Sequence, residues 1–224
     1  MTRIFLIGDS TMSTYPEARY PRMGWGQVLQ DYIPGAEIRN HAVPGRSTKS
    51  FYEQGHFEEV EELLQEGDFL FIQFGHNDSK KDDPIRFTNP WSDYQDNLKM
   101  YIDAALSKQA RPILLTPVAR RYFDESGNLI DAHGDYPKSM RKLAADLDIP
   151  LVDVTHLSEA WLRKQQPEAT KQFFMWLSPG EYDYYPEGSE DNTHFTEKGS
   201  HEIAKITANA LVEKGIIPPR WMTV

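Results

Sequence analysis

The sequence predicts an α/β protein built on a parallel sheet with helices on both faces. Three observations lead to this fold class: short apolar runs recur along the chain, amphipathic helical patterns separate them, and no apolar stretch approaches the roughly 20 residues of a membrane span. Short runs rich in Ile, Phe, Leu and Val are typical of strands covered on both faces. Strands that alternate with helices favour a parallel sheet.

Five segments have strand character. In chain order they are Arg3–Ile7, Ala36–Val43, Asp68–Phe74, Arg111–Val118 and Pro150–Val154. Asp68–Phe74 (DFLFIQF) has the strongest signal because it is almost continuously apolar, whereas Ala36–Val43 is weaker.

Helical patterns occupy most of the intervening chain. They cover Trp25–Ile33, Phe57–Gln65, Asp93–Ser107, Pro137–Leu147, Leu157–Gln165 and Glu197–Lys214. Thr196 precedes the last of these and is the type of residue that caps a helix N-terminus. Ser79–Pro90 and Ser178–Thr193 are polar and rich in turn residues, so we expect long loops there. Because no repeat or linker divides the 224 residues, we expect one domain over residues 1–224.

Composition excludes several function classes. The chain has no cysteine, which excludes a thiol nucleophile, a disulfide framework and a cysteine metal site. Its net charge of −10 disfavours general binding to nucleic acid or anionic membranes. The first apolar run is too short for an export signal, so we expect a cytoplasmic protein with no membrane segment.

Polar, glycine-containing segments follow the predicted strands. They are Gly8-Asp9-Ser10-Thr11, Val43-Pro44-Gly45-Arg46-Ser47 and Phe74-Gly75-His76-Asn77-Asp78, and Asp191-Asn192-Thr193-His194 precedes the final helix. In open α/β sheets, ligands bind outside the carboxyl ends of the strands. Each segment alone has an ordinary interpretation as a turn or loop. Together, however, they supply every group that acyl transfer needs.

The candidate chemistry centres on a serine hydroxyl, which becomes a nucleophile only when a base removes its proton. We expect Ser10 to be the nucleophile and His194 the base. Asp191 would fix the imidazole tautomer and stabilise the imidazolium. The backbone N–H groups of Ser10 and Gly45 and the side-chain amide of Asn77 are the candidate oxyanion donors. Gly45 has no side chain to obstruct a substrate.

These segments resemble the four ordered blocks of the SGNH, or GDSL-like, hydrolases. They occur in family order and span nearly the whole chain, with Thr11 where many members have leucine. The resemblance implies a flavodoxin-like three-layer α/β/α sandwich with a five-stranded parallel sheet. It also implies an esterase with a triad of Ser10, Asp191 and His194 and an oxyanion hole of Ser10, Gly45 and Asn77. The blocks look most like the rhamnogalacturonan acetylesterase branch, which implies deacetylation of a plant cell-wall polysaccharide through an acetyl-serine intermediate.

Two alternatives remain open on the sequence. One is a broad-specificity carbohydrate esterase, lysophospholipase or thioesterase of the same superfamily, because substrates differ freely on one fold. The other is a catalytically inactive carbohydrate-binding module. The chain lacks a Gly-x-Ser-x-Gly elbow, a P-loop, a dinucleotide fingerprint and a His-Glu-x-x-His motif. We therefore expect no cofactor and no metal, and the sequence makes no prediction of oligomeric state.

The expected partner is an acetylated carbohydrate. Aromatic side chains are frequent in Phe173–Thr193, directly before the triad residues, and such rings pack on sugar faces. Trp176 and Tyr184 are therefore candidate substrate contacts, although the segment also reads as a cover for the core. Arg46 and His76 are further candidates. For His76 we favour a role in positioning its loop, and for Asp9 a role as a turn acceptor.

The net charge conflicts with an acidic substrate such as pectin until its distribution is considered. Four loops that follow the strands contain nine basic and four acidic residues; they are Pro16–Gly24, Gly45–Ser50, Asp78–Arg86 and Val118–Phe123. Phe173–Thr193 has five acidic residues and no basic one. Because the local field of a cleft steers a ligand, we expect one basic wall and one acidic, aromatic wall.

Overall fold

The computed structural model describes residues 1–222 and contains the five-stranded parallel sheet. Its strands are β1 (Arg3–Gly8), β3 (Glu37–Asn40), β4 (Phe69–Gln73), β5 (Arg111–Leu115) and β6 (Leu151–Val152). They lie in the order β3-β1-β4-β5-β6, and every neighbouring pair is parallel. This order confirms the flavodoxin-like sheet and places the switch point beside β1, where the direction of the crossovers reverses.

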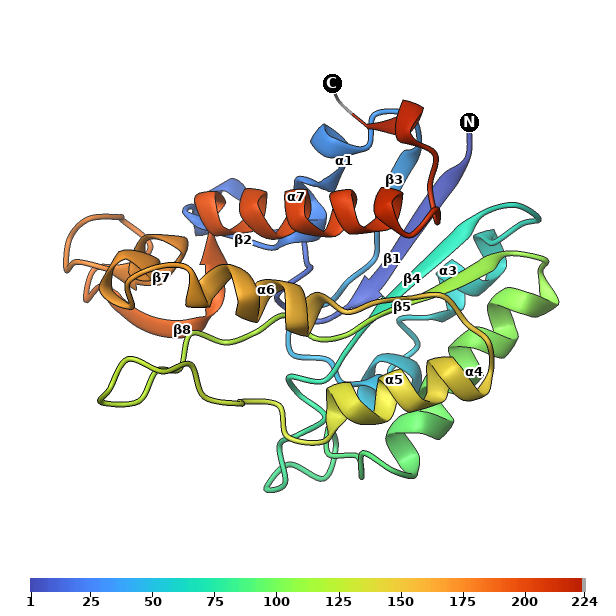
Figure 1. The fold of residues 1–224 in the computed structure, drawn as a ribbon, viewed down its shortest axis with the longest axis horizontal. Coiled ribbons are helices and arrows are strands. Elements are labelled where there is room, and N and C mark those ends of the chain that lie inside the picture. Colours follow the sequence, from blue (N-terminus) through green and yellow to red (C-terminus); the bar gives the residue numbers. More distant parts are fainter. Residues whose placement is uncertain (223–224) are drawn as a thin grey trace.

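Helices cover both faces of this sheet, which completes the three layers (Figure 1). One face carries α1 (Leu29–Tyr32), α6 (Val154–Arg163) and α7 (Glu197–Glu213); the other carries α2 (Thr48–Glu53), α3 (Glu58–Leu63), α4 (Asp93–Ser107) and α5 (Tyr136–Asp146). Because side chains alternate along a strand, Ile4 and Leu6 pack into the first layer, and Phe5 and Ile7 into the second. Burial on both faces explains why β1 is continuously apolar.

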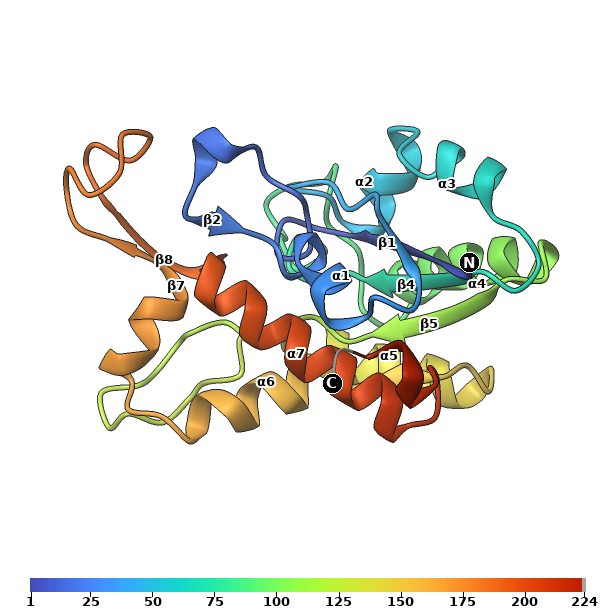
Figure 2. The ribbon, with the colours of Figure 1, turned by 90° about the horizontal axis from the view of Figure 1, so that it is seen from above.

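A second, three-stranded antiparallel sheet was not predicted. It consists of β2 (Arg22–Met23), β8 (Ser189–Thr196) and β7 (Phe174–Leu177), in that order. It extends from one end of the sandwich, and the hairpin between β7 and β8 projects beside the segment before β2 (Figure 2). Our prediction of a loop through Ser178–Thr193 was therefore wrong from Ser189 onward. Phe174 and Phe195 form a buried pair that fixes this sheet to the core.

Two helical segments also differ from the prediction. Trp25–Ile33 is a 3₁₀ turn, Trp25–Gln27, followed by the short α1. The Trp25 N–H donates to the Thr11 carbonyl and its indole donates to Gln73, which anchors the start of this segment to the Ser10 turn and β4. Helix α2 was missed, and Ser47 caps it by accepting from the Ser50 N–H.

The remaining helices match their predicted positions within a few residues, and Thr196 caps α7 as expected by accepting from the Gly199 N–H. The remaining 3₁₀ turns are Glu17–Arg19, Glu168–Phe173 and Pro219–Trp221. Within residues 1–222, no helix is long and apolar enough to cross a membrane.

Candidate active site

Ser10 lies two residues beyond the end of β1, at the carboxyl edge of the sheet. Asp9 organises this turn, because its Oδ1 accepts hydrogen bonds from the Thr11 N–H and hydroxyl at 3.0 and 2.9 Å. The Tyr15 hydroxyl donates to the Ser10 carbonyl at 2.8 Å. Gly8 is required before the turn, since a Cβ there would meet the Gln73 carbonyl oxygen of β4 at 2.7 Å.

The three predicted triad side chains meet although Ser10 and His194 are 184 residues apart. The Ser10 Oγ lies 2.8 Å from His194 Nε2, and His194 Nδ1 lies 2.6 Å from Asp191 Oδ2. Asp191 and His194 both belong to β8, which pairs with β2 on one side and β7 on the other. Both residues therefore belong to a strand, at a shift in its register with β7, although a loop was expected through Thr193.

Asp191 is ionised in this arrangement. Burial raises its pKa, but the His194 ring and the backbone N–H groups of Thr193 and His194 outweigh it and lower the pKa of Asp191 to about 2. An ionised carboxylate only accepts hydrogen bonds, so His194 Nδ1 carries the proton and donates to it. Nε2 of a neutral His194 is then the acceptor, and the Ser10 hydroxyl donates to it. This is the proton arrangement of a nucleophile with its general base.

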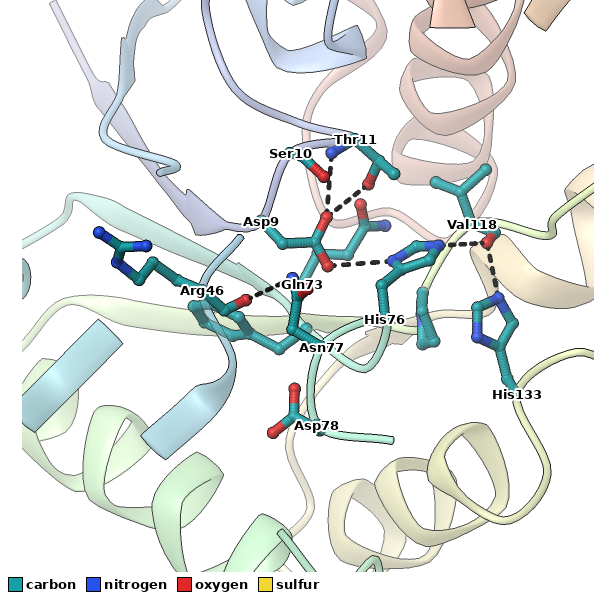
Figure 3. A network of polar contacts seen from close by, with 12 residues as sticks. Asp9, Ser10, Thr11, Arg46, Gln73, His76, Asn77, Asp78, Val118 and His133 are labelled. Atoms are coloured by element: carbon teal, nitrogen blue, oxygen red, sulfur yellow. Dashed lines mark hydrogen bonds and ion pairs between the residues drawn. The ribbon is translucent and has the colours of Figure 1, made fainter. Parts of the chain in front are cut away.

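Two of the three predicted oxyanion donors come from segments that lie next to each other. Gly45 follows β3 and has φ +78°, a left-handed conformation that favours glycine. Asn77 follows β4, and its Nδ2 donates to the Arg46 carbonyl at 2.9 Å (Figure 3). That bond occupies one amide hydrogen and fixes the orientation of the amide. The second hydrogen of Asn77 is left for an oxyanion.

His76 is buried behind the Ser10 turn, with 3% of its surface exposed. Its Nδ1 lies 3.0 Å from Asp9 Oδ2 and its Nε2 lies 3.1 Å from the Val118 carbonyl oxygen (Figure 3). Both ring nitrogens therefore face acceptor atoms, an arrangement that suits a protonated ring paired with the Asp9 carboxylate. Although burial opposes it, the charge of His76 lowers the pKa of Asp9. These contacts favour the positioning role for His76 over contact with a substrate.

A second buried histidine adjoins this pair. His133 Nε2 lies 2.8 Å from the same Val118 oxygen, and its ring meets His76 edge to face with 4.7 Å between centroids. Burial, followed by the charge of His76, lowers the pKa of His133 well below its ordinary value. His133 is therefore neutral, and it packs on the side of the His76–Asp9 pair that faces away from Ser10.

The other candidate substrate contacts are already engaged. The Arg46 side chain donates to His56 Nε2 and to the Pro44 carbonyl. The Trp176 indole donates to Asn192 Oδ1 at 2.8 Å, and cations of Arg121 and Lys171 lie against its ring. Tyr184 is 46% exposed, with the Arg19 guanidinium 4.1 Å from its ring centroid. Of these aromatic rings, Tyr184 therefore offers the more open surface.

Three of the basic residues expected in the basic wall lie near one another, beside the segments of Gly45 and Asn77. Arg120 donates to the His76 carbonyl, and Arg86 Nη1 lies 4.0 Å from where a Cβ on Gly45 would be. Burial and then the charges of Arg86 and Arg120 lower the pKa of Lys80. Arg86 also pairs with Asp83 at 2.5 Å. We call Lys80, Arg86 and Arg120 the cation cluster.

Other predicted basic residues are used structurally. Arg121 is buried and bonds Thr170, Asn192 and the Pro167 carbonyl, so it supports β8 and does not line the cleft. Lys49 donates to the Pro84 carbonyl.

Two hollows flank the hairpin of the second sheet. One of about 210 Å³ is lined by residues that include Tyr20, Trp176 and Thr196, and one of about 450 Å³ by residues that include Tyr20, Tyr182 and Tyr184. A more apolar hollow of about 440 Å³ lies at the opposite end of the sheet, where Phe69 and Arg111 begin their strands. Within residues 1–222, no three His, Cys, Asp or Glu side chains are arranged to hold a metal ion.

Residues 4–207 match the family model of the GDSL-like lipases and acylhydrolases. The chain belongs to this family. The matched region contains the three predicted triad residues and the segments of Gly45 and Asn77.

Known relatives match nearly the whole chain. The sequence is 43% identical over 215 residues to rhamnogalacturonan acetylesterase RhgT of Bacillus subtilis (strain 168), across 96% of this chain and 91% of that protein. It is 37% identical over 214 residues to probable rhamnogalacturonan acetylesterase YesY of the same organism, across 95% and 94% of the two chains. The crystal structure of protein YxiM from Bacillus subtilis is similar with a TM-score of 0.82 at 26% identity, across 96% of this chain and 57% of that one.

Sequence reasoning missed two residues that support the site. Asp78, beside Asn77, accepts three hydrogen bonds from Thr48 and Thr88, and Asn192, beside Asp191, accepts from Trp176 and Arg121. Their positions inside the Asn77-Asp78 and Asp191–His194 motifs were a signal, but their partners lie far away in sequence.

Proposed function

We propose that the protein is a serine esterase that removes acetyl groups from rhamnogalacturonan or its oligosaccharides. The observation that carries the proposal is the continuous chain of contacts from Ser10 Oγ through His194 to Asp191. It supplies a nucleophile, a base and an orienting carboxylate. The names of the relatives at 43% and 37% identity support rhamnogalacturonan as the substrate.

The geometry suits acyl transfer in two steps. His194 Nε2 takes the Ser10 proton while the Ser10 oxygen attacks the acetyl carbonyl carbon, and the resulting oxyanion accepts from the Ser10 and Gly45 N–H groups and the Asn77 amide. The C–O bond to the sugar then breaks, and His194 gives its proton to the departing sugar oxygen. Water, deprotonated by His194, attacks the acetyl-serine, which releases acetate and restores Ser10.

The hairpin that leads to Asp191 and His194 favours a sugar ester over a long acyl chain. The two hollows beside it combine tyrosine rings with polar groups, such as Gln172 and Glu197 in one and Asp183 in the other, although the triad itself lines neither. The hollow at the far end of the sheet cannot receive an acyl chain attached to Ser10. The cation cluster adjoins the oxyanion donors, and its excess of positive charge suits the carboxylates of a pectic substrate.

The test is acetate release from acetylated rhamnogalacturonan, other acetylated pectins and xylan, together with hydrolysis of nitrophenyl esters of increasing chain length. We expect the highest kcat/KM on acetylated rhamnogalacturonan and a decline as the acyl chain lengthens. A Ser10→Ala variant should lose activity on every substrate and resist labelling by an organophosphate serine reagent.

Three outcomes would count against the proposal. Equal activity on long-chain and acetyl esters would favour a broad esterase or lysophospholipase. Sugar binding without hydrolysis or labelling would favour the binding module. Undiminished acetate release by Ser10→Ala would overturn the mechanism.

A further inference from the structure

Asp78 is a fully buried carboxyl group that the proposed mechanism does not use. Its Oδ1 accepts from the Thr48 N–H at 3.0 Å, the Thr48 hydroxyl at 2.5 Å and the Thr88 hydroxyl at 3.0 Å. Its Oδ2 is buried and has no hydrogen-bond partner within residues 1–222. A carboxyl group in such a place is costly, so its role needs a physical reason.

The bonds of Asp78 join the two segments that carry oxyanion donors. Thr48 begins α2, three residues after Gly45, whereas Asp78 directly follows Asn77 at the end of β4. The Asn77 amide forms a second link between the same segments, to the Arg46 carbonyl. The separation between the Gly45 N–H and the Asn77 amide is therefore set by these two adjacent links.

Helix capping explains only one of the three hydrogen bonds that Asp78 accepts, the one from the Thr48 N–H. Helix α2 already has its own cap, in which Ser47 and Ser50 exchange side-chain and backbone hydrogen bonds. Asp78 adds a bond from outside the helix, and both ends of that bond are anchored further. The Tyr101 hydroxyl donates to the Thr48 carbonyl at 2.6 Å, and the Tyr136 hydroxyl donates to the Asp78 carbonyl at 2.8 Å.

We propose that Asp78 is a positioning residue of the oxyanion hole, which acts through Thr48 to hold the Gly45 N–H at a fixed distance from the Asn77 amide. The inference rests on the proposed function, because an oxyanion hole has a role only in acyl transfer. Donors must lie about 2.7–3.1 Å from the developing oxyanion, and a misplacement of about 1 Å can cost roughly 100-fold in rate.

The comparison of Asp78→Asn with Asp78→Ala tests this role. Burial raises the pKa of Asp78 to about 7, although the hydrogen bonds from Thr48 lower it. The carboxyl group is therefore readily neutral, and an amide is a close substitute for it. The amide oxygen can keep the three bonds of Oδ1, and its nitrogen would occupy the unpartnered position of Oδ2. We expect Asp78→Asn to retain kcat within about threefold and Asp78→Ala to lose about 10- to 100-fold, with KM changed less than about threefold in both.

Asp153→Ala is the matched control. Asp153 caps α6 by accepting from the His156 N–H, bonds the Thr116 hydroxyl just after β5 and pairs with Arg141, but it does not adjoin the oxyanion segments. The Asp153→Ala variant should lower the thermal midpoint as Asp78→Ala does, while its kcat stays within about twofold of the parent value. A fall in kcat for Asp153→Ala equal to that for Asp78→Ala, at equal loss of stability, would reduce Asp78 to a structural residue.

A milder pair keeps the inference testable if Asp78→Ala does not fold. Thr48→Val keeps the shape but removes the hydroxyl bond to Asp78 and the bond that the same hydroxyl accepts from Asn97. Thr155→Val removes a buried hydroxyl bond to the Pro117 carbonyl, at the start of α6. Thr48→Val should lower kcat about three- to tenfold and Thr155→Val less than twofold. Equal kcat for Thr48→Val and the parent would overturn the proposal.

All variants are assayed with nitrophenyl acetate and by the rate of Ser10 labelling with an organophosphate reagent. Both reactions place an oxygen in the oxyanion hole whatever alcohol the natural substrate carries. Failure to release acetate from polysaccharide would thus contradict the proposed function and leave this result interpretable. Unchanged kcat and labelling rates in a folded Asp78→Ala protein would refute the positioning role.

Discussion

Replacing Asp191 by asparagine should abolish most activity by changing the tautomer of His194. Asp191 Oδ1 accepts from the backbone N–H groups of Thr193 and His194 at 2.7 and 3.0 Å. The amide oxygen of the introduced asparagine would therefore remain at that position, because only an acceptor satisfies two N–H groups. Its NH₂ would face His194 Nδ1 and donate to it. The ring proton would then move to Nε2, which could no longer accept from Ser10.

The expected loss in kcat is about 10⁴-fold, the size seen when this tautomer is reversed in serine proteases. The same change should alter the dependence of stability on pH. The pKa of Asp191 falls from 3.8 to about 2 on folding, which corresponds to at most about 2.5 kcal/mol. Because its side chain is 30% exposed, we discount this for solvent screening to about 1 kcal/mol.

The sign follows from the direction of the shift. A carboxyl group whose pKa is lower in the folded state contributes stability above its unfolded pKa, and that contribution disappears as pH falls from about 4 towards about 2. The parent protein should therefore lose about 1 kcal/mol more stability than Asp191→Asn between pH 5 and pH 2.

Urea unfolding at a series of pH values, together with nitrophenyl acetate kinetics, measures both effects. Ser10→Ala is the matched control, because it removes the nucleophile and leaves the Asp191–His194 pair in place. It should be inactive yet retain the acid dependence of the parent. Activity of Asp191→Asn within tenfold of the parent would refute the tautomer argument. If the stability of Asp191→Asn changed with pH as that of the parent does, the predicted contribution of the Asp191 charge to stability would be refuted.

Three further changes test the rest of the site. Asn77→Ala removes one oxyanion donor and should lower kcat about 10²–10³-fold with little change in KM, as steady-state kinetics would show; a loss under tenfold would exclude Asn77 from the oxyanion hole. Lys80→Glu should raise KM for acidic pectic oligomers at low salt while leaving nitrophenyl acetate hydrolysis unaffected, and Lys108→Glu, the same change at an exposed distant position, should alter neither; equal effects of the two would mean that only net charge matters. His76→Asn leaves the Asp9 carboxylate buried without its cation, so urea unfolding should show a loss of about 3 kcal/mol, whereas a change below about 1 kcal/mol would contradict a buried ion pair.

The parallel strands and the positions of their ligand-binding ends could be predicted because they depend on local pattern. Ile4–Ile7 and Phe69–Ile72 are buried on both faces, and continuous burial leaves a continuous apolar run in the sequence. Ser10 and Asn77 follow such strands directly, so their meeting at one edge required only that the strands be parallel. The five apolar runs predicted the strand count, and the resemblance to SGNH hydrolases supplied the three-layer sandwich.

The second sheet could not be predicted in the same way. Strand β8 is half-buried and reads Ser-Glu-Asp-Asn-Thr-His-Phe-Thr, which has neither an apolar run nor strand-forming residues throughout. It is a strand because β2 and β7 pair with it on either side, and both partners come from other parts of the chain. Asp191–His194 lie in a register shift between the pairs that β8 forms at Glu190 and at Phe195, so distant strands fix both ends of this segment.

The sequence by itself determined which atoms could perform the proposed chemistry, whereas the tertiary structure decided which charged groups surround them. Residue type fixes that Ser10 can attack, that His194 can accept a proton and that Asn77 can donate. No local pattern distinguishes Arg121, whose guanidinium is bonded inside the second sheet, from the adjacent Arg120, which lies against His76. Whether a charged side chain lines the cleft or stabilises the fold depends on which distant polar groups it contacts, and these contacts exist only after the chain has folded.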